Sequence, residues 1–196
     1  TPVRDVRTLA AEAKVIILAE KPQDIDPVLG ELRKSLTAKH LVISIAAGIT
    51  MSFLQRRLGK GIRVIRTMPN MPAQIGEGIT AISRGKSATH ADVKITEKIF
   101  QAVGQTVAVP EAMIDAVTAV SGSGPAYVFF FAECLEQASR KLGLNKELAR
   151  CLVMSTVRGS VHQMLNSGIE PAALRVKVTS KGGTTQAAMD VFERYR

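Results

Sequence analysis

The stretch that decides the fold is Val15–Gly48, which reads VIILAEKPQDIDPVLGELRKSLTAKHLVISIAAG. Both of its ends, Val15–Ala19 and Leu41–Ala46, are short apolar runs of the kind that form buried strands. The segment between them, Ile25–Leu36, has apolar residues at the spacing of one helix face. An apolar strand, an amphipathic helix and a second apolar strand in this order predict a βαβ unit with parallel strands.

The same alternation continues to about residue 110. Further elements are expected as a helix over Met51–Leu58, a strand over Ile62–Thr67, a short apolar strand over Ile79–Ile82, a helix over Ala91–Val103 and a strand over Thr106–Val109. We therefore predict a Rossmann-type, largely parallel sheet domain over residues 1–110 and an all-helical domain over residues 111–196. The fold class is α/β followed by all-α.

The helical half contains two long helical patterns, Pro125–Leu142 and Lys146–Asn166, separated at Gly143, and a shorter one at Pro171–Val176. The first pattern has apolar residues on several faces: Val128, Phe129, Phe130, Phe131 and Leu135. A domain of this size cannot hide so much apolar surface by itself. We expect these helices to form a homodimer.

Composition restricts the class of protein. The chain has 196 residues, 46% hydrophobic residues and a formal net charge of +9. A basic balance suits a phosphorylated cofactor or nucleic acid, but the cations are dispersed and aromatic residues are scarce, which disfavours nucleic acid. The apolar runs are too short to span a bilayer, and residues 1–5 lack the apolar core of a signal peptide. Two cysteines within helical patterns and three scattered histidines predict a cytoplasmic protein without a disulfide or a metal site.

Three predicted strands end in unusual residues. These are Ala19-Glu20-Lys21-Pro22, Ala46-Ala47-Gly48 and Met68-Pro69-Asn70. Ligands of doubly wound sheets bind at the carboxyl ends of the strands, so the three segments together indicate a cofactor crevice. Each alone is also typical of an ordinary turn, Lys21 could be a solvated lysine, and Met68 could belong to the core. The glycine fingerprint of dinucleotide folds does not occur in residues 1–196.

The second candidate site is Val178–Gln186, which reads VTSKGGTTQ and precedes an apolar helical pattern. A glycine-rich loop that leads into a helix N-terminus presents backbone N–H groups to an anion. The same residue types also serve as an ordinary helix cap, and the local pattern leaves both interpretations open.

Five segments together resemble a known family. They are ILAEKPQ at 17–23, SIAAGI at 44–49, RTMPNMPA at 66–73, DAVTAVSGSGPAY at 115–127 and VTSKGGTT at 178–185. In order and spacing they are similar to pyrroline-5-carboxylate reductases, which catalyse the last step of proline biosynthesis. Two positions depart from the family pattern: Glu20 replaces an apolar residue, and Lys181 replaces a proline.

The resemblance implies an N-terminal NAD(P)-binding Rossmann domain and a C-terminal helical domain that forms an intertwined dimer, often assembled into decamers. It also implies that the family's first βαβ unit and a C-terminal helical segment are missing from this sequence. The implied reaction is hydride transfer from NADPH or NADH to the C=N carbon of Δ1-pyrroline-5-carboxylate, giving L-proline.

The resemblance also assigns roles to residues. The substrate carboxylate would bind Gly182, Gly183 and Thr184, with Ser180 in the same loop, and the Thr185 hydroxyl would bind the imine nitrogen. Glu111 matches a substrate-side position, although it could equally be a surface carboxylate at a helix start. The cofactor would bind Ala19, Glu20, Lys21, Pro22, Ala46, Ala47, Gly48, Met68 and Asn70.

Two other functions stay open at this point. One is a related reductase that acts on a hydroxy acid or another imine; Phe129, Phe130 and Phe131 disfavour it, since they occupy the middle of the helix that would carry a proton donor. The other is a non-catalytic protein that keeps the dimer domain and the loop without binding cofactor.

Overall fold

The computed structural model describes residues 5–195 and divides into two compact units, the first ending at Val128 and the second beginning at Phe129. The first unit extends past residue 110 and includes the first turn of the long helix that begins at Gly124. The division into functional domains at residue 110 stays a prediction. The predicted absence of a signal peptide concerns mainly residues 1–4, which lie outside the described residues.

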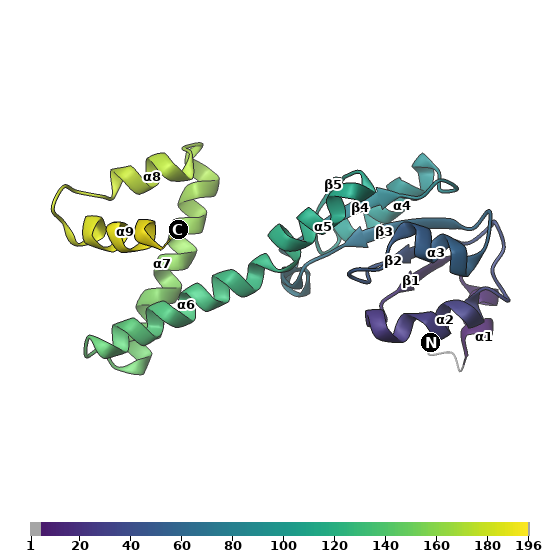
Figure 1. Cartoon of the computed structure of the whole chain (residues 1–196), viewed down its shortest axis with the longest axis horizontal. Helices are drawn as coiled ribbons and strands as arrows, with labels where there is room; N and C mark the ends of the chain where they lie inside the picture. The colour runs from purple at the N-terminus through teal and green to yellow at the C-terminus, as the bar shows by residue number, and fades with distance from the viewer. Residues whose placement is uncertain (1–4, 196) are drawn as a thin grey trace. The chain divides into compact units, whose positions relative to one another are not determined.

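The first unit is an α/β sheet domain (Figure 1). Its elements in chain order are α1 Val6–Glu12, β1 Val15–Leu18, the 3₁₀ turn η1 Pro22–Asp24, α2 Ile25–Leu32, β2 Leu41–Ser44, α3 Met51–Leu58, β3 Arg63–Met68, η2 Met71–Ile75, β4 Gly78–Arg84, α4 His90–Gln101, β5 Gly104–Ala108, η3 Glu111–Met113, α5 Ile114–Val117, the π-helical turn η4 Thr118–Gly122 and the start of α6 Gly124–Lys141. This confirms the predicted sheet class.

The sheet formed by the described residues has five strands in the order β1-β2-β3-β4-β5. The pairs β1–β2, β2–β3 and β4–β5 are parallel, whereas β4 is antiparallel to β3. The reason is the short Pro69–Glu77 connection, because a parallel pair needs a crossover of a dozen or more residues. The sheet is therefore largely parallel, as predicted, with one reversal.

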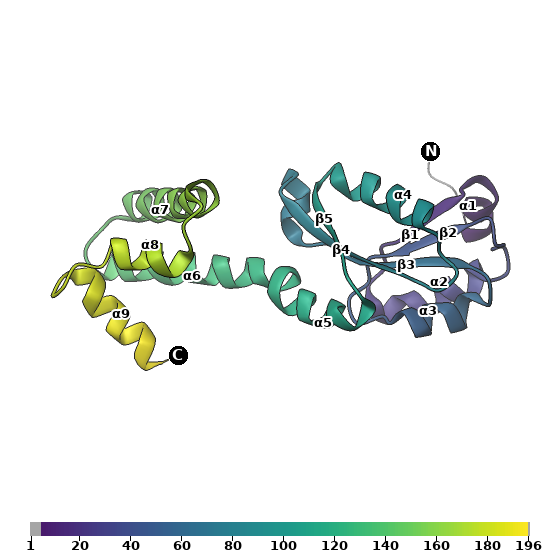
Figure 2. The ribbon, with the colours of Figure 1, turned by 90° about the horizontal axis from the view of Figure 1, so that it is seen from above.

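Helices cover both faces of the sheet (Figure 2). On one face α1, α2 and α3 pack against Ile16, Leu18, Val42 and Val64. On the other face α4 packs against a cluster that includes Ile43, Ile65 and Phe100. These strands are apolar on both faces because both faces are covered, which is why they read as continuous apolar runs.

Two helices differ from the sequence predictions. The expected helix Ile25–Leu36 ends at Leu32 and continues as tight turns, with the Ser35 N–H donating to the Leu32 carbonyl at 2.9 Å. Helix α1 was not predicted; Asp5 caps it by accepting the Thr8 N–H at 2.8 Å.

The second unit is helical. It contains most of α6, then α7 Lys146–Ser167, α8 Pro171–Lys177 and α9 Thr184–Arg194, close to the predicted helices. Within it Ala149 and Val153 are buried, while Phe129, Phe130 and Phe131 are 50–65% exposed. The described part of this unit therefore leaves a large apolar surface uncovered.

Candidate functional site

The three predicted strand-end segments lie at one edge of the sheet. Leu18 is in register with Ser44, and Ser44 with Arg66, so β1, β2 and β3 end side by side. The residues that follow these ends are mostly accessible: Ala19, Glu20, Lys21, Pro22, Ala47 and Gly48 are exposed, Met68 and Asn70 are half-buried, and Ala46 is buried. The structure thus brings the proposed cofactor residues together, and it gives the Glu20 carboxylate an exposed position.

The loop Ala46–Thr50 connects β2 to α3. Its first residue is tied to the strand, since the Ala46 N–H donates to Ser44 Oγ at 3.3 Å. Gly48 has a φ of +73° with open space where a Cβ would lie, so the turn favours glycine and leaves room above the backbone. Thr50 caps α3 by accepting the Phe53 N–H at 3.2 Å. Small residues in a fixed turn allow a ligand to approach the backbone closely.

Met68 and Asn70 have neighbours within the first unit. The Asn70 Oδ1 accepts the Ile79 N–H at 3.0 Å and thereby fixes the start of β4. A Cβ on Gly122 would lie 2.6 Å from Met68 Cε, so the Met68 side chain packs closely against η4 and would have to shift if Gly122 carried a side chain. Asn70 therefore has a structural task whatever else it binds, and Met68 is packed on one side.

A buried cation lies beneath the same edge. The Arg66 side chain is 4% exposed, and its Nη1 donates to Glu111 Oε1 at 3.2 Å. Its Nη2 lies 3.4 Å from Asp115 Oδ1, a carboxylate that is 89% exposed. Glu111 Oε1 also accepts the Met51 N–H at the start of α3, at 2.5 Å. Glu111, predicted on the substrate side, thus has two protein partners.

The second candidate site has the backbone expected of an anion-binding loop. Gly182 adopts a φ of +70°, and the Gly183 N–H donates to the Ser180 carbonyl at 3.0 Å, which closes a turn. Gly183 is the N-cap of α9, so Thr184 and Thr185 begin the helix. First-turn N–H groups have no acceptor within their helix, so those of Thr184 and Thr185, together with that of Gly182, are candidate donors to an anion.

Helices α8 and α9 hold this loop as a hairpin. Arg175 on α8 pairs with Glu193 on α9 at 2.8 Å, and the Thr179 hydroxyl donates to the Arg175 carbonyl at 2.7 Å. Lys181 and Ser180 are exposed, and Thr185 is half-buried. The structure therefore brings Ser180, Gly182, Gly183, Thr184 and Thr185 together in the second unit, whereas the strand-end residues and Glu111 belong to the first.

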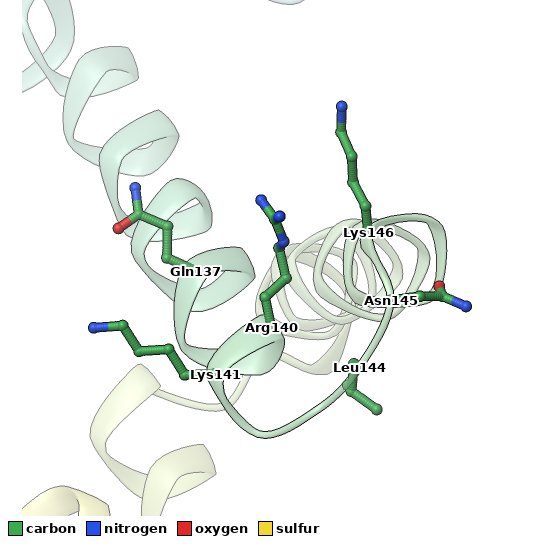
Figure 3. Close-up of a pocket in the computed structure, with 6 residues that line it drawn as sticks. All are labelled: Gln137, Arg140, Lys141, Leu144, Asn145 and Lys146. Carbon is green, nitrogen blue, oxygen red and sulfur yellow. The ribbon is translucent and has the colours of Figure 1, made fainter.

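A pocket elsewhere in the second unit does not involve any of these residues. It has a volume of about 500 Å³ and is lined by Gln137, Arg140, Lys141, Leu144, Asn145 and Lys146 at the α6–α7 turn. Figure 3 shows its charged side chains extending in different directions instead of converging on one point. We interpret it as a solvated basic surface.

Residues 5–195 contain no group of three or more His, Cys, Asp or Glu side chains placed to hold a metal ion. Within the same range, every helix is too short or too polar to cross a membrane.

Comparison with known proteins identifies the family. Residues 111–196 match the family model described as pyrroline-5-carboxylate reductase dimerisation, and residues 2–48 match that of NADP oxidoreductase, coenzyme F420-dependent. Pyrroline-5-carboxylate reductase 3 of Xenopus laevis is 40% identical over 97% of this chain and 69% of its own length. The chain belongs to the pyrroline-5-carboxylate reductase family.

Solved structures agree with this assignment. A Plasmodium falciparum pyrroline carboxylate reductase, described as bound to NADP, has a TM-score of 0.93 at 32% identity, over 98% of this chain and 73% of its own. The Coxiella burnetii pyrroline-5-carboxylate reductase has a TM-score of 0.85 at 39% identity, over 98% and 72%. The family, the fold class and the oxidoreductase class that the sequence predicted are confirmed, and the findings support the predicted NADP cofactor.

Sequence reasoning missed two parts of this reductase's sheet edge. Arg66 was quoted as part of a motif but given no role, although an arginine within an apolar strand is itself a signal of a buried ion pair. The contact between Met68 and Gly122 had no local signal, because the two residues are far apart in the chain.

Proposed function

We propose that this chain reduces Δ1-pyrroline-5-carboxylate to L-proline with NADPH. The observation that carries the proposal is the Ser180–Thr185 loop, in which an αL glycine precedes a helix start whose N–H and hydroxyl groups can bind an anion. The family assignment supports the same reaction. A non-catalytic role lacks a comparable observation in its favour.

The residues at the sheet edge fit a nucleotide cofactor. Exposed, small side chains at Ala19, Ala47 and Gly48 leave the backbone open to a flat ring, and parallel strand ends are where such ligands bind. When bound, NADPH supplies the hydride. Lys21 is exposed beside the first strand end, where a cation favours phosphate.

The loop would hold the substrate by its carboxylate. The predicted donors are the N–H groups of Gly182, Gly183 and Thr184, but the Gly183 N–H donates to the Ser180 carbonyl at 3.0 Å, so we propose Gly182, Thr184 and Thr185 instead. Lys181 adds a cation to the same loop. The Thr185 hydroxyl would then hydrogen-bond the imine nitrogen. A protonated imine is already a strong electrophile, so fixing its position and compensating its charges is most of what these residues need to do.

We also propose a cytoplasmic homodimer that assembles further into a decamer. The exposed Phe129, Phe130 and Phe131 on α6 support an interface on the helical unit, and this unit lies within the matched dimerisation model. Cys134 and Cys151 are free thiols, as expected in a reducing compartment. Light scattering would test the assembly, and a monomeric mass would contradict it.

Activity is tested with Δ1-pyrroline-5-carboxylate and NADPH, comparing the wild type with Thr185→Ala. Losing the hydroxyl removes one hydrogen bond to the reacting group, so kcat/KM for the imine should fall by about 10- to 100-fold while the Kd for NADPH stays within twofold. Thr185→Ser, which keeps the hydroxyl, should restore most of the activity. An unchanged kcat/KM in Thr185→Ala would remove Thr185 from the mechanism. A wild type that binds NADPH but does not reduce the imine would contradict the proposed substrate.

A further inference from the structure

Glu111 makes the contact that fixes the start of α3 from outside the β2–α3 segment. Thr50 supplies the other cap, but it belongs to the same local segment as the helix. The Met51 N–H is a first-turn donor and has no acceptor within α3. Its acceptor is Glu111 Oε1 at 2.5 Å, on η3, sixty residues further along the chain.

Arg66 in turn holds Glu111. This arginine is in register with Ser44, the last residue of β2, and with Ser83 on β4. Both serines are small, and all three residues are buried, so the arginine lies in a polar row across the sheet, next to the strand end from which the Ala46–Thr50 loop leaves. Its Nε finds no hydrogen-bond partner among residues 5–195, and the more distant Asp115 is almost fully exposed. Glu111 is therefore the principal compensation of this charge.

The two contacts form a continuous tie from β3 through Arg66 and Glu111 to the first turn of α3. The loop between β2 and α3 contains Ala46, Ala47 and Gly48, which line the proposed cofactor edge. Gly48 permits a left-handed turn but does not restrict the loop to one conformation, since glycine is the most flexible residue. A tie at the downstream end of the loop removes that freedom before a ligand binds.

We propose that Arg66 and Glu111 are positioning residues that hold the Ala46–Thr50 loop in its cofactor-binding conformation. This role replaces the substrate contact that the family resemblance implies for Glu111, because its Oε1 already accepts from Met51 and Arg66. This inference rests on the proposed function in one respect, namely that the ligand of the loop is NADPH. A second consequence concerns the phosphates of the cofactor. Because Glu111 places a carboxylate on the first turn of α3, that helix start is already occupied by an anion, and the phosphates must bind elsewhere.

The test compares three variants of the full chain. Glu111→Ala removes both contacts, and Glu111→Gln keeps an oxygen that can accept the Met51 N–H. Asp115→Asn is the matched control, because it also removes a carboxylate from Arg66 but one that is exposed and makes the longer contact. Three quantities are measured: hydrogen exchange of the Met51 amide by NMR, the KM for each reactant, and kcat.

In Glu111→Ala the Met51 amide should exchange about tenfold faster, and the KM for NADPH should rise about tenfold, whereas the KM for the imine and kcat stay within about twofold. Glu111→Gln should recover part of both effects, and Asp115→Asn should match the wild type. A merely structural role would lower the melting temperature without separating the two KM values.

Two results would overturn the proposal. One is a Met51 amide that exchanges at the wild-type rate in Glu111→Ala; the other is an equal rise of both KM values. If Glu111→Ala does not fold, Glu111→Gln decides through the KM values alone: a rise for NADPH without a rise for the imine supports the proposal, and an equal rise of both overturns it. If the wild type does not reduce the imine, the proposed function fails separately, and NADPH fluorescence titration together with the Met51 exchange rate still decides the positioning role.

Discussion

Gly182→Ala tests whether the left-handed turn of the Ser180–Thr185 loop is needed for substrate binding. Gly182 has a φ of +70°, and no atom lies within 4 Å of where its Cβ would be. The effect of an added methyl is therefore conformational and not a clash. A non-glycine residue in this region costs about 1–2 kcal/mol. If this cost shifts the loop away from its left-handed conformation, the fraction of molecules able to bind the substrate falls about 5- to 30-fold, and the KM for the imine rises by the same factor.

Gly168→Ala is the matched control. Gly168 ends α7 with a φ of +63°, is exposed like Gly182 and also has open space around a built Cβ. It carries the same strain without belonging to the proposed site. Both variants should lower the melting temperature by similar amounts, but only Gly182→Ala should raise the KM for the imine, with the KM for NADPH unchanged. The reasoning is refuted if the KM for the imine stays within twofold in Gly182→Ala, or if it rises as much in Gly168→Ala.

Two further predictions concern stability. In Gly104→Ala the Cβ would lie 2.0 Å from the Gly78 carbonyl oxygen on the paired strand β4, so backbone must move and we expect a loss of about 3 kcal/mol or more in urea unfolding. Gly124 has open space where a Cβ would lie, so Gly124→Ala should change the free energy of unfolding by less than about 1 kcal/mol. Equal urea midpoints for the two variants would contradict the close approach of Gly104 to Gly78. The hydrogen bond from the Thr8 N–H holds the pKa of Asp5 below its usual 3.8, so the charged form stabilises α1 above that pH and the contribution is lost as the pH falls through the lowered pKa. Exchange of the Thr8 amide should therefore accelerate, relative to its intrinsic rate, below pH 3.8 in the wild type but not in Asp5→Asn; a pH-independent ratio would exclude this cap.

The sequence predicts local structure well where one pattern determines it. The strands that begin at Val15 and Leu41 are short apolar runs, and the start of α9 follows from two glycines and two threonines. The reversal at β4 was also readable, because the connection from Asn70 is too short for a parallel crossover. In these cases the determining residues are neighbours in the chain.

Pairing across long separations could not be predicted in this way. Arg66 signals a buried cation, but nothing near it in sequence indicates that Glu111 is its partner, 45 positions away. The same holds for the acceptor of the Met51 N–H. A single sequence specifies which groups need partners, whereas the fold decides which partners they receive.

The ion pairs of the described residues indicate how this chain divides its charged groups. Arg57–Asp26, Arg63–Asp92, Arg66–Glu111 and Arg175–Glu193 each join two elements of one unit. These carboxylates are paired with cations, so they are poorly placed to serve as a general base. The Ser180–Thr185 loop contains no carboxylate and offers backbone N–H groups, hydroxyl groups and the Lys181 cation. The N–H groups suit a substrate carboxylate, and the Thr185 hydroxyl oxygen can accept the N–H of a protonated cyclic imine. Such an electrophile needs orientation more than proton transfer from the protein. Ion pairs within each unit and a loop proposed to bind the substrate through N–H and hydroxyl groups thus fit one reaction.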